Sequence, residues 1–244
     1  SSDSWDPSMS NRDVPQSILT RYKSVSTATI YTSLSINQGI RCFLEGVQPM
    51  TPGRKMAARA RTLRCLPPRP DFYERVTDGE NSPEYRAMAL CGPGDALVVD
   101  FMRWPYATDL GDVKLLQLQM QGASGFVTDG AIRDLDVIAT YGFPIFAQAR
   151  TPSALEYGKA FEENVPIQCA GILVMPGDLV IGDNDGVVVV PADLAESVLN
   201  WVEEHENAEE HVKRRILETN SNPGRFYPPT DELKEELRRQ NGSS

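Results

Sequence analysis

Three short apolar runs, separated by two segments with helical spacing, lie between residues 95 and 149, and they constrain the fold more than any other feature. The first run, ALVVD, follows a Gly-Pro-Gly turn and ends at Asp100, and the others are Gly125-Phe126-Val127 and PIFAQA. The intervening segments, one starting at Asp112 and one following Arg133, carry apolar residues at helical intervals. Alternating strands and helices of this kind predict an α/β fold, with a sheet that carries helices on its faces.

The rest of the chain adds helices before this region and strands after it. Residues 15–36 have the spacing of two short helices, and the small alternating residues from about Arg54 predict a strand that ends before Pro67. We expect a loop over residues 67–88. Residues 166–191 contain three apolar runs separated by turn sequences, and a helix of about seven turns follows Pro191. The tripeptide Pro-Gly-Asp occurs twice, each time before a strand, which indicates a turn used twice.

Composition favours one globular domain. With 244 residues, of which 41% are hydrophobic, the chain can bury one core. We expect a flexible N-terminal segment over 1–14, a single domain over 15–232 and a C-terminal tail over 233–244. The net charge of -10 argues against nucleic acid as a partner. No apolar run approaches about 18 residues and the N-terminus has no signal-peptide pattern, so we expect a soluble, cytoplasmic protein without a membrane partner.

The cysteines and histidines restrict the chemistry. The four cysteines show no CxxC spacing, which favours buried, reduced thiols over disulfides or a zinc site. His205 and His211 are six residues apart on a charged helix, a spacing that does not place them on one face. A Ser-His-Asp triad and a histidine-rich metal centre are therefore not expected. Any metal would have oxygen ligands, which favours Mg²⁺ or Mn²⁺.

The segment from Gly111 to Asp134 is the candidate site. Asp112 lies where a helix begins and backbone N–H groups lack partners, which makes that helix end an anion site. Arg133 and Asp134 should emerge at the end of a strand, with Asp129 and Asp136 nearby, where ligands of α/β sheets gather. A guanidinium, carboxylates and a helix N-terminus suit a small oxo-acid and a divalent cation. The alternative is that Asp112 is a plain N-cap and that Arg133 and Asp134 are a solvated pair at a helix start.

Three other features have simpler interpretations. The sequence GDNDG at 182–186 is typical of a hairpin turn and lacks the glutamate of a calcium loop. The sequence GPGD at 92–95 lacks the residues of a phosphate-binding loop. Arg103, Trp104 and Tyr106 could form either a specificity wall over a pocket or a packed loop.

Several motifs together resemble the RraA-like family. They are RTLRCLP, PGDALVVD, GASGFVTDGAIRD, FPIFA, VPIQCAGILVMPGDLVIGDNDGVVVVP and the terminal FYPPTDE, and the resemblance covers about residues 20–232. The family includes class II 4-hydroxy-4-methyl-2-oxoglutarate/4-carboxy-4-hydroxy-2-oxoadipate aldolases and regulators of ribonuclease E activity. The resemblance implies a layered sheet and helix sandwich like the phosphohistidine swivelling domain. It also implies a trimer or a dimer of trimers with sites at the subunit clefts.

The resemblance also implies roles for individual residues. Arg133 matches the arginine that holds the substrate's 2-oxo group, Asp134 the metal-binding aspartate, and Asp112 the acid that orients water at the metal. The helix start matches the amides that hold the pyruvyl carboxylate, namely those of Gly111, Val113, Lys114 and Leu115. A glutamate of the neighbouring subunit completes the aldolase site, and Glu209 or Glu210 is the nearest match.

The activity implied is that of a metal-dependent carbon–carbon lyase. It would cleave a 4-hydroxy-2-oxo acid to pyruvate and a second carbonyl product, and it would also decarboxylate oxaloacetate, because both reactions form the pyruvate enolate. Two alternatives remain: a non-catalytic regulator that binds an RNA-processing enzyme, and a dedicated 2-oxo-acid decarboxylase. The chain departs from the family pattern at Val137, where an acid is frequent, and in the loop FMRWPYATDL, which is often rich in glycine.

Overall fold

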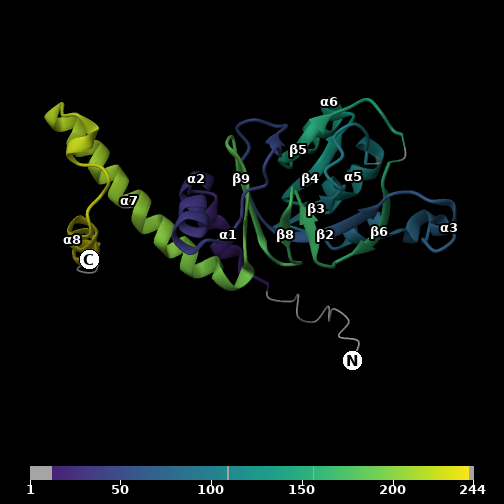
Figure 1. Ribbon diagram of the computed structural model, residues 1–244, viewed down its shortest axis with the longest axis horizontal. Coiled ribbons are helices and arrows are strands. Elements are labelled where there is room, and N and C mark those ends of the chain that lie inside the picture. The colour runs from purple at the N-terminus through teal and green to yellow at the C-terminus, as the bar shows by residue number, and fades with distance from the viewer. Residues whose placement is uncertain (1–12, 109, 156, 242–244) are drawn as a thin grey trace.

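A mixed sheet that curls until it is nearly closed forms the centre of the protein (Figure 1). The structure is a computed structural model that describes residues 13–108, 110–155 and 157–241. The two edges of the sheet approach each other where the Leu44 N–H donates to the Val187 carbonyl oxygen at 3.0 Å and Phe43 forms a bridge with Val188. The α/β class predicted from the sequence is confirmed.

The order of the large sheet is β1-β5-β4-β3-β2-β9-β10, and β6 also pairs with β2. Strands β2 to β5 run parallel to one another, while β1, β6, β9 and β10 pair antiparallel. A separate hairpin is formed by β7 (Ile167–Cys169) and β8 (Ile172–Val174). The strands of the large sheet are β1 (Gln48–Pro49), β2 (Met56–Leu66), β3 (Asp95–Asp100), β4 (Gly125–Ile132), β5 (Ile145–Arg150), β6 (Lys159–Glu163), β9 (Leu179–Asp183) and β10 (Gly186–Val190).

Helices cover the outside of this sheet. The α-helices are α1 (Gln16–Tyr22), α2 (Thr27–Tyr31), α3 (Pro70–Tyr73), α4 (Pro83–Ala89), α5 (Asp112–Met120), α6 (Leu135–Ile138), α7 (Ala195–Thr219) and α8 (Asp231–Asn241). Shorter helical turns are η2 (Thr32–Ile36), η3 (Gly79–Asn81), η4 (Ala139–Tyr141), η5 (Ala192–Leu194) and η6 (Pro223–Arg225).

Alternation along the strands divides the core. In β3, Ala96 and Val98 face the inside of the curled sheet, while Leu97 and Val99 face the layer that contains α4 and α5. Successive strand residues point to opposite faces, so a strand buried on both sides is apolar throughout. A second outer layer, formed by α1, α2 and the first half of α7, packs over β9 and β10.

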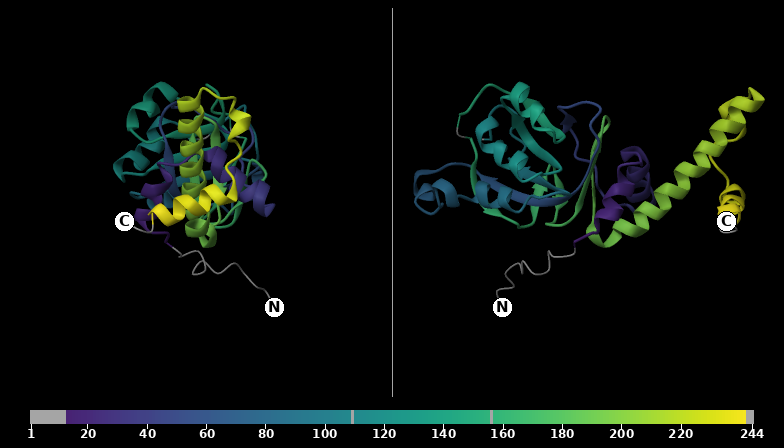
Figure 2. Two further views of the ribbon diagram at one scale, coloured as in Figure 1. Left: turned by 90° about the vertical axis from the view of Figure 1, so that its left-hand side faces the viewer. Right: turned by 180° about the vertical axis from the view of Figure 1, so that it is seen from behind.

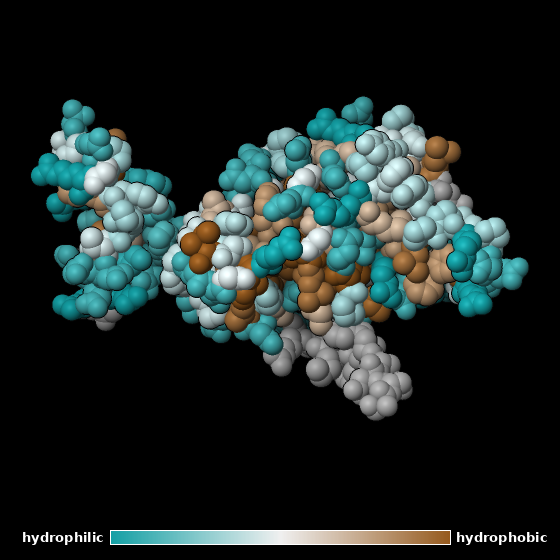
Figure 3. Space-filling model, viewed as in Figure 1, coloured by the Kyte–Doolittle hydropathy of each residue, from teal (hydrophilic) through white to brown (hydrophobic). Residues whose placement is uncertain are grey.

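Helix α7 projects away from the sheet, and α8 turns back beside it (Figure 2). Hydrophilic side chains cover this projecting part, whereas apolar side chains gather on the body (Figure 3). No helix among residues 13–108, 110–155 and 157–241 is long and apolar enough to span a bilayer. The domain boundary predicted at 232 falls inside α8, and most of the predicted N-terminal segment, residues 1–12, lies outside the described residues.

Most predicted elements are confirmed. The two short N-terminal helices, the strand after Arg54, the hairpin at 182–186 and the seven-turn helix after Pro191 are all present. The two Pro-Gly-Asp turns precede β3 and β9, and the four cysteines are free and buried.

Two predictions were wrong, and several short elements were not predicted. The loop expected over 67–88 contains α4, because Pro83 suits the first helical turn and Ala87 and Met88 are buried in the outer core. The strand expected over residues 125–129 continues to Ile132, and every residue of β4 is buried. Strand β6 was not predicted, since its polar sequence KAFEE is ordered by pairing with β2.

Candidate active site

The candidate site lies where β4 ends and α5 begins. Gly111 is the N-cap of α5, and the carboxylate of Asp134 approaches this helix end, with the Asp112 N–H donating to Asp134 Oδ2 at 3.4 Å. A negative charge at a helix N-terminus is stabilised by the unpaired amides and the helix dipole. The convergence predicted from the sequence is therefore present in the geometry: the two ends of the segment from Gly111 to Asp134 meet.

Arg133 and Asp134 form a half-buried ion pair. Arg133 Nε donates to Asp134 Oδ2 at 3.0 Å, and the two side chains are 32% and 31% exposed. Asp134 has a left-handed backbone, with φ of 55°, as it starts α6. A non-glycine residue in this conformation is uncommon, and such strain is concentrated at functional sites. The pair is thus held at the edge of the sheet, open to solvent on one side.

Gly111 lets this approach happen. A Cβ atom at residue 111 would lie 2.7 Å from Asp134 Oδ2 and 3.3 Å from Arg133 Nε. The backbone of Gly111 is extended, so the requirement for glycine comes from space and not from φ.

Two residues outside the predicted set hold the site. The hydroxyl of Tyr141 donates to the Asp112 carbonyl oxygen at 3.1 Å, and the Thr151 N–H donates to the Ile132 carbonyl oxygen at 3.0 Å. Tyr141 is separated from Asp112 by a strand and a helix, and no local pattern marks it. Only the packing of α6 against α5 brings the two together.

The first turn of α5 presents the amides of Asp112, Val113 and Lys114. The Leu115 N–H donates to the Gly111 carbonyl oxygen at 3.0 Å, and its side chain is buried, so Leu115 contributes packing at this helix end. The side chain of Val113 is 80% exposed. Lys114 Nζ lies 3.2 Å from Glu84 Oε1 of α4.

Glu209 and Glu210 do not reach this site within one chain. Both lie on α7, which runs away from the part of the molecule that carries α5 and α6 (Figure 1). Glu209 Oε1 is 3.3 Å from His205 Nε2, and Glu210 Oε1 is 2.6 Å from Lys213 Nζ. Either glutamate could join Arg133 only from a second copy of the chain.

Asp129 does not surround Arg133, which corrects the expectation from the sequence. It is fully buried in β4 and accepts a hydrogen bond from the Phe101 N–H at 2.7 Å. Its carboxylate is bonded instead to the amide of Gln168 and to the Ala170 N–H.

The loop that follows β3 is packed, with an exposed aromatic edge. The ring of Trp104 stacks on that of Tyr157, with centroids 3.6 Å apart, and Tyr106 meets Trp104 edge to face. Trp104 packs on the outer core, whereas Tyr106 is 67% exposed. The packed-loop interpretation therefore holds for Trp104.

The donor set at the site is sparse but suits a hard cation. Among residues 13–108, 110–155 and 157–241, no three His, Cys, Asp or Glu side chains gather as a metal centre. Asp134 and Asp112 supply carboxylates at one helix end. Mg²⁺ is commonly held by one or two carboxylates, with water and substrate as the remaining ligands. The residues present fit an ion of that type.

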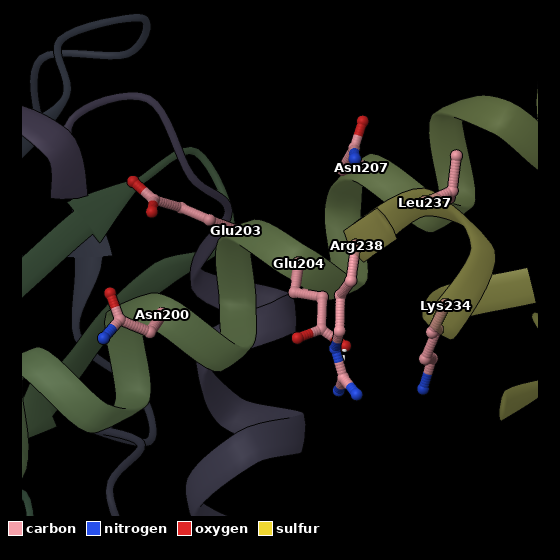
Figure 4. A pocket seen from close by; sticks show the side chains of 7 residues that line it. All are labelled: Asn200, Glu203, Glu204, Asn207, Lys234, Leu237 and Arg238. Carbon is pink, nitrogen blue, oxygen red and sulfur yellow. Dashed lines mark hydrogen bonds and ion pairs between the residues drawn. The ribbon is translucent and has the colours of Figure 1, made fainter. Parts of the chain in front are cut away.

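A hollow between α7 and α8 is separate from this site. It is lined by Asn200, Glu203, Glu204, Asn207, Lys234, Leu237 and Arg238 (Figure 4). Three of its four charged side chains are paired, since Glu204 bonds Arg238 at 2.6 Å and Glu203 bonds Arg21. It lies on the projecting part of the molecule.

The curled sheet and the Arg-Asp pair at a helix N-terminus define an α/β protein with a candidate site for a small anion. The sequence profile of the RraA-like family, described as Aldolase/RraA, matches residues 27–189, which is more than half of the chain. The chain therefore belongs to the RraA-like family.

Individual relatives agree with this assignment. A protein of Halalkalibacterium halodurans, provisionally named 4-hydroxy-4-methyl-2-oxoglutarate aldolase, is 30% identical over 209 residues, which cover 86% of this chain and 92% of that protein. A similarly named protein of Pseudomonas fluorescens is 35% identical over 115 residues, or 47% of this chain and 71% of its own length.

Solved structures show the same fold. Streptomyces coelicolor RraAS2, described as an unusual member of the RNase ES inhibitor RraA protein family, superposes with a TM-score of 0.73 at 29% identity. The match covers 86% of this chain and 99% of that one. An uncharacterised protein of Pseudomonas syringae, 24% identical, has a TM-score of 0.71 over 87% of this chain and 97% of its own.

Proposed function

We propose that the protein is a divalent-metal-dependent class II pyruvate aldolase. Its substrate would be a 4-hydroxy-2-oxo acid of the 4-hydroxy-4-methyl-2-oxoglutarate type. The observation that carries the proposal is the Arg133–Asp134 pair at the N-terminus of α5, supported by relatives named as aldolases of this substrate. The same site would decarboxylate oxaloacetate, because both reactions leave the enolate of pyruvate.

Different residues of this chain would bind the substrate and stabilise the developing charge. The amides of Asp112, Val113 and Lys114 would bind the carboxylate of the pyruvyl half. The guanidinium of Arg133 would donate to the 2-oxo oxygen and stabilise the negative charge that develops there as the C3–C4 bond breaks. The 4-hydroxyl would give its proton to water and C4 would become a carbonyl carbon, while the electron pair of the C3–C4 bond forms the enolate. C3 would then take a proton from water oriented by Asp112, so that no proton is gained or lost overall.

Asp134, with Asp112 nearby, would hold Mg²⁺ or Mn²⁺. When bound, such an ion supplies Lewis acidity to the carboxylate and the 2-oxo oxygen. To bind the metal, Asp134 would give up its bond to Arg133 Nε. The guanidinium of Arg133 would then be free to bind the substrate.

The protein would act as a homo-oligomer of three or six chains, with Glu209 or Glu210 of one chain completing the site of another. Apolar side chains on α5 beside the site support the proposal that another chain covers this surface. Val113 and Met120 are 80% and 79% exposed, and Leu116 is 39% exposed. The cytoplasm is the expected location.

Metal-dependent release of pyruvate tests the proposal. The purified protein, incubated with 4-hydroxy-4-methyl-2-oxoglutarate and Mg²⁺ or Mn²⁺, should release pyruvate, and EDTA should abolish the release. Arg133→Ala should lower kcat/KM by about 100-fold or more, because it removes a donor to the developing oxyanion. Arg69→Ala is the matched control, since this exposed arginine is paired only with its neighbour Asp71. Turnover unchanged in Arg133→Ala and in EDTA would refute the proposal.

A second candidate is a regulator that binds an RNA-processing endoribonuclease. The likeness to the Streptomyces protein, whose description names an RNase ES inhibitor family, favours it. The net charge of -10 suits a basic partner. Inhibition of such a nuclease by a protein without lyase activity would support this candidate, and activity on 2-oxo acids without nuclease binding would exclude it. A dedicated 2-oxo-acid decarboxylase would turn over oxaloacetate but leave 4-hydroxy-2-oxo acids intact.

A further inference from the structure

Two buried carboxylates lie side by side beneath the loop that leads to the candidate site. Asp100 ends β3 and Asp129 lies in β4, and the register that pairs Val99 with Thr128 makes them neighbours. Asp129 is fully buried and Asp100 is 6% exposed. Gln168 of β7 donates its amide Nε2 to both, at 2.8 Å to Asp129 Oδ2 and also to Asp100 Oδ1. These three residues are the buried carboxylate cluster.

The cluster binds the backbone of two separate loops. Asp129 Oδ1 accepts from the Phe101 N–H at 2.7 Å, and Asp129 Oδ2 accepts from the Ala170 N–H at 3.1 Å. Asp100 Oδ1 accepts from the Met102 N–H at 2.9 Å. Hydrogen bonds from backbone amides to carboxylates are among the stronger ones in proteins. The cluster therefore ties the start of the loop after β3 to the turn of the β7–β8 hairpin.

The backbone at these bonds is strained. Met102, Arg103 and Ala170 have φ of 57°, 56° and 49°, which is the left-handed region that residues with a Cβ avoid. Residues in this conformation persist only where the surrounding structure holds them. Two non-glycine residues in sequence with this conformation indicate a loop whose course is imposed by its bonds.

Close packing removes any freedom left at Phe101. A Cβ atom at Gly130 would lie 2.7 Å from Phe101 Cβ, and one at Gly158 would lie 2.8 Å from its ring. The ring thus occupies a slot between two glycines, while its N–H is held by Asp129.

From this anchor the loop runs to the candidate site. The Tyr106 carbonyl oxygen accepts from Thr151 Oγ1 at 2.9 Å, and the Thr108 N–H donates to the Ser153 carbonyl oxygen at 3.3 Å. Thr151 also donates its N–H to Ile132, the residue before Arg133. Residues 106 and 108 of the loop are therefore bonded to the segment that follows β5, and this segment is bonded in turn to the end of β4 beside Arg133.

We propose that the buried carboxylate cluster is a positioning device, which sets the course of the loop residues 101–108 and so helps to place the N-terminus of α5 against Arg133 and Asp134. Its kinetic consequence rests on the proposed function, but its structural consequence does not. Burial raises the pKa of Asp100, and the charge of Asp129 adds to the effect.

The two acids differ in a way that makes the proposal testable. Asp100 uses one oxygen, Oδ1, for both of its bonds, so an asparagine can keep them. Asp129 uses both oxygens, and an asparagine would point an amide N–H at the N–H of Phe101 or Ala170. We therefore expect Asp100→Asn to retain the position of the loop and Asp129→Asn to lose it.

Amide hydrogen exchange and kinetics are the measurements. In Asp129→Asn, exchange over residues 101–103 and 110–112 should rise about tenfold or more, because the loop opens locally. Its kcat for pyruvate release should fall about tenfold or more with a smaller change in KM, because the reacting groups are misplaced. Asp100→Asn should stay within about twofold of the wild type in both respects.

Controls separate positioning from general loss of stability. Leu199→Ala removes a buried side chain of α7, far from the loop, and should lower the melting temperature without changing exchange at 101–112. If Asp129→Asn does not fold, Gln168→Met replaces it and should raise exchange in the same segments. Equal behaviour of the two asparagine variants, or unchanged exchange in Asp129→Asn, would overturn the proposal. A wild type without lyase activity would refute the proposed function and leave the exchange result to decide the positioning role.

Discussion

At the scale of single residues, the candidate site depends on close approach more than on unusual groups. Gly111, Arg133 and Asp134 are ordinary residues, and what sets them apart is that a helix start and a strand end meet within hydrogen-bonding distance. The absence of a side chain at residue 111 makes this approach possible.

Gly111→Ala should therefore reduce activity with little loss of stability. The new methyl group would meet the end of the Asp134 side chain, which can swing toward solvent, so the cost in unfolding free energy should stay below about 1 kcal/mol. Displacement of Asp134 should lower kcat/KM for pyruvate release by about 100-fold. Gly92→Ala is the control, because a Cβ there meets only an ordinary contact at 3.8 Å. Full activity of Gly111→Ala would contradict the geometry of the site.

In each of the two Pro-Gly-Asp turns, the aspartate side chain closes the turn by accepting a hydrogen bond from the backbone. Asp95 Oδ2 accepts from the Gly92 N–H at 3.1 Å, and Asp178 Oδ2 accepts from the Met175 N–H at 2.9 Å. The glycines, Gly94 and Gly177, have φ of 85° and 89°. The same three residues thus build the same turn twice.

Asp178 should make stability depend on pH. Burial raises the pKa of its carboxyl group, although the N–H groups of Met175 and Ala192 oppose the shift. A carboxyl group with a raised pKa in the folded state contributes stability at pH below its unfolded pKa, and that contribution is lost as the pH rises through the folded pKa. Urea unfolding of wild type and Asp178→Asn from pH 4 upward measures it. The free energy of the wild type minus that of the variant should fall with pH, and a rise would contradict the assignment.

At the scale of elements, helix α7 has a first half that packs into the core and a mostly exposed second half. Its first half buries Val198, Leu199 and Val202 against α1, α2 and the sheet, while Leu217 near its end is 80% exposed. The buried half anchors the helix, and the remaining turns extend beyond the body, where α8 folds back on them.

Leucine truncations at the two ends of α7 should differ sharply. Leu199→Ala leaves a cavity in the core and should lower the free energy of unfolding by about 2–5 kcal/mol. Leu217→Ala should change it by no more than about 0.5 kcal/mol in a monomer. Denaturant unfolding at low protein concentration measures both. A large effect at Leu217 that grows with protein concentration would show that a second chain covers this end of the helix.

At the scale of the whole molecule, one chain by itself does not bring Glu209 or Glu210 to the candidate site. Arg133 and Asp134 lie on the curled sheet, whereas Glu209 and Glu210 lie on the projecting helix (Figure 1). The proposed function therefore requires that one copy's α7 reach the site of another.

Mixing two inactive variants should restore activity. Arg133→Ala and a variant with Glu209→Gln and Glu210→Gln damage different halves of each site, so some sites in mixed oligomers would be intact. Unfolding and refolding the two together should give more pyruvate release than either alone. Arg133→Ala mixed with Asp134→Ala is the control and should stay inactive, because both changes fall in the same half. Failure of the first mixture, with mixed oligomers demonstrated, would remove the two glutamates from the site.

Much of the fold could be predicted because its elements are locally encoded. The apolar runs of β3 and β4 and the helical spacing after Asp112 each carry their own periodicity. Helix α4 and strand β6 could not be predicted, since their short polar sequences are ordered by contacts with distant segments.

The sequence by itself determined the strand and helix pattern, the family, and the candidate trio Asp112, Arg133 and Asp134. It could do so because turns, periodicity and charge are properties of neighbouring residues. Only the tertiary structure decided that Gly111 lies against Asp134, that Gln168 bridges Asp129 and Asp100 beneath a strained loop, and that Tyr141 holds the start of α5. These contacts join segments that are distant along the chain, and their geometry follows from how the sheet curls and where the helices pack.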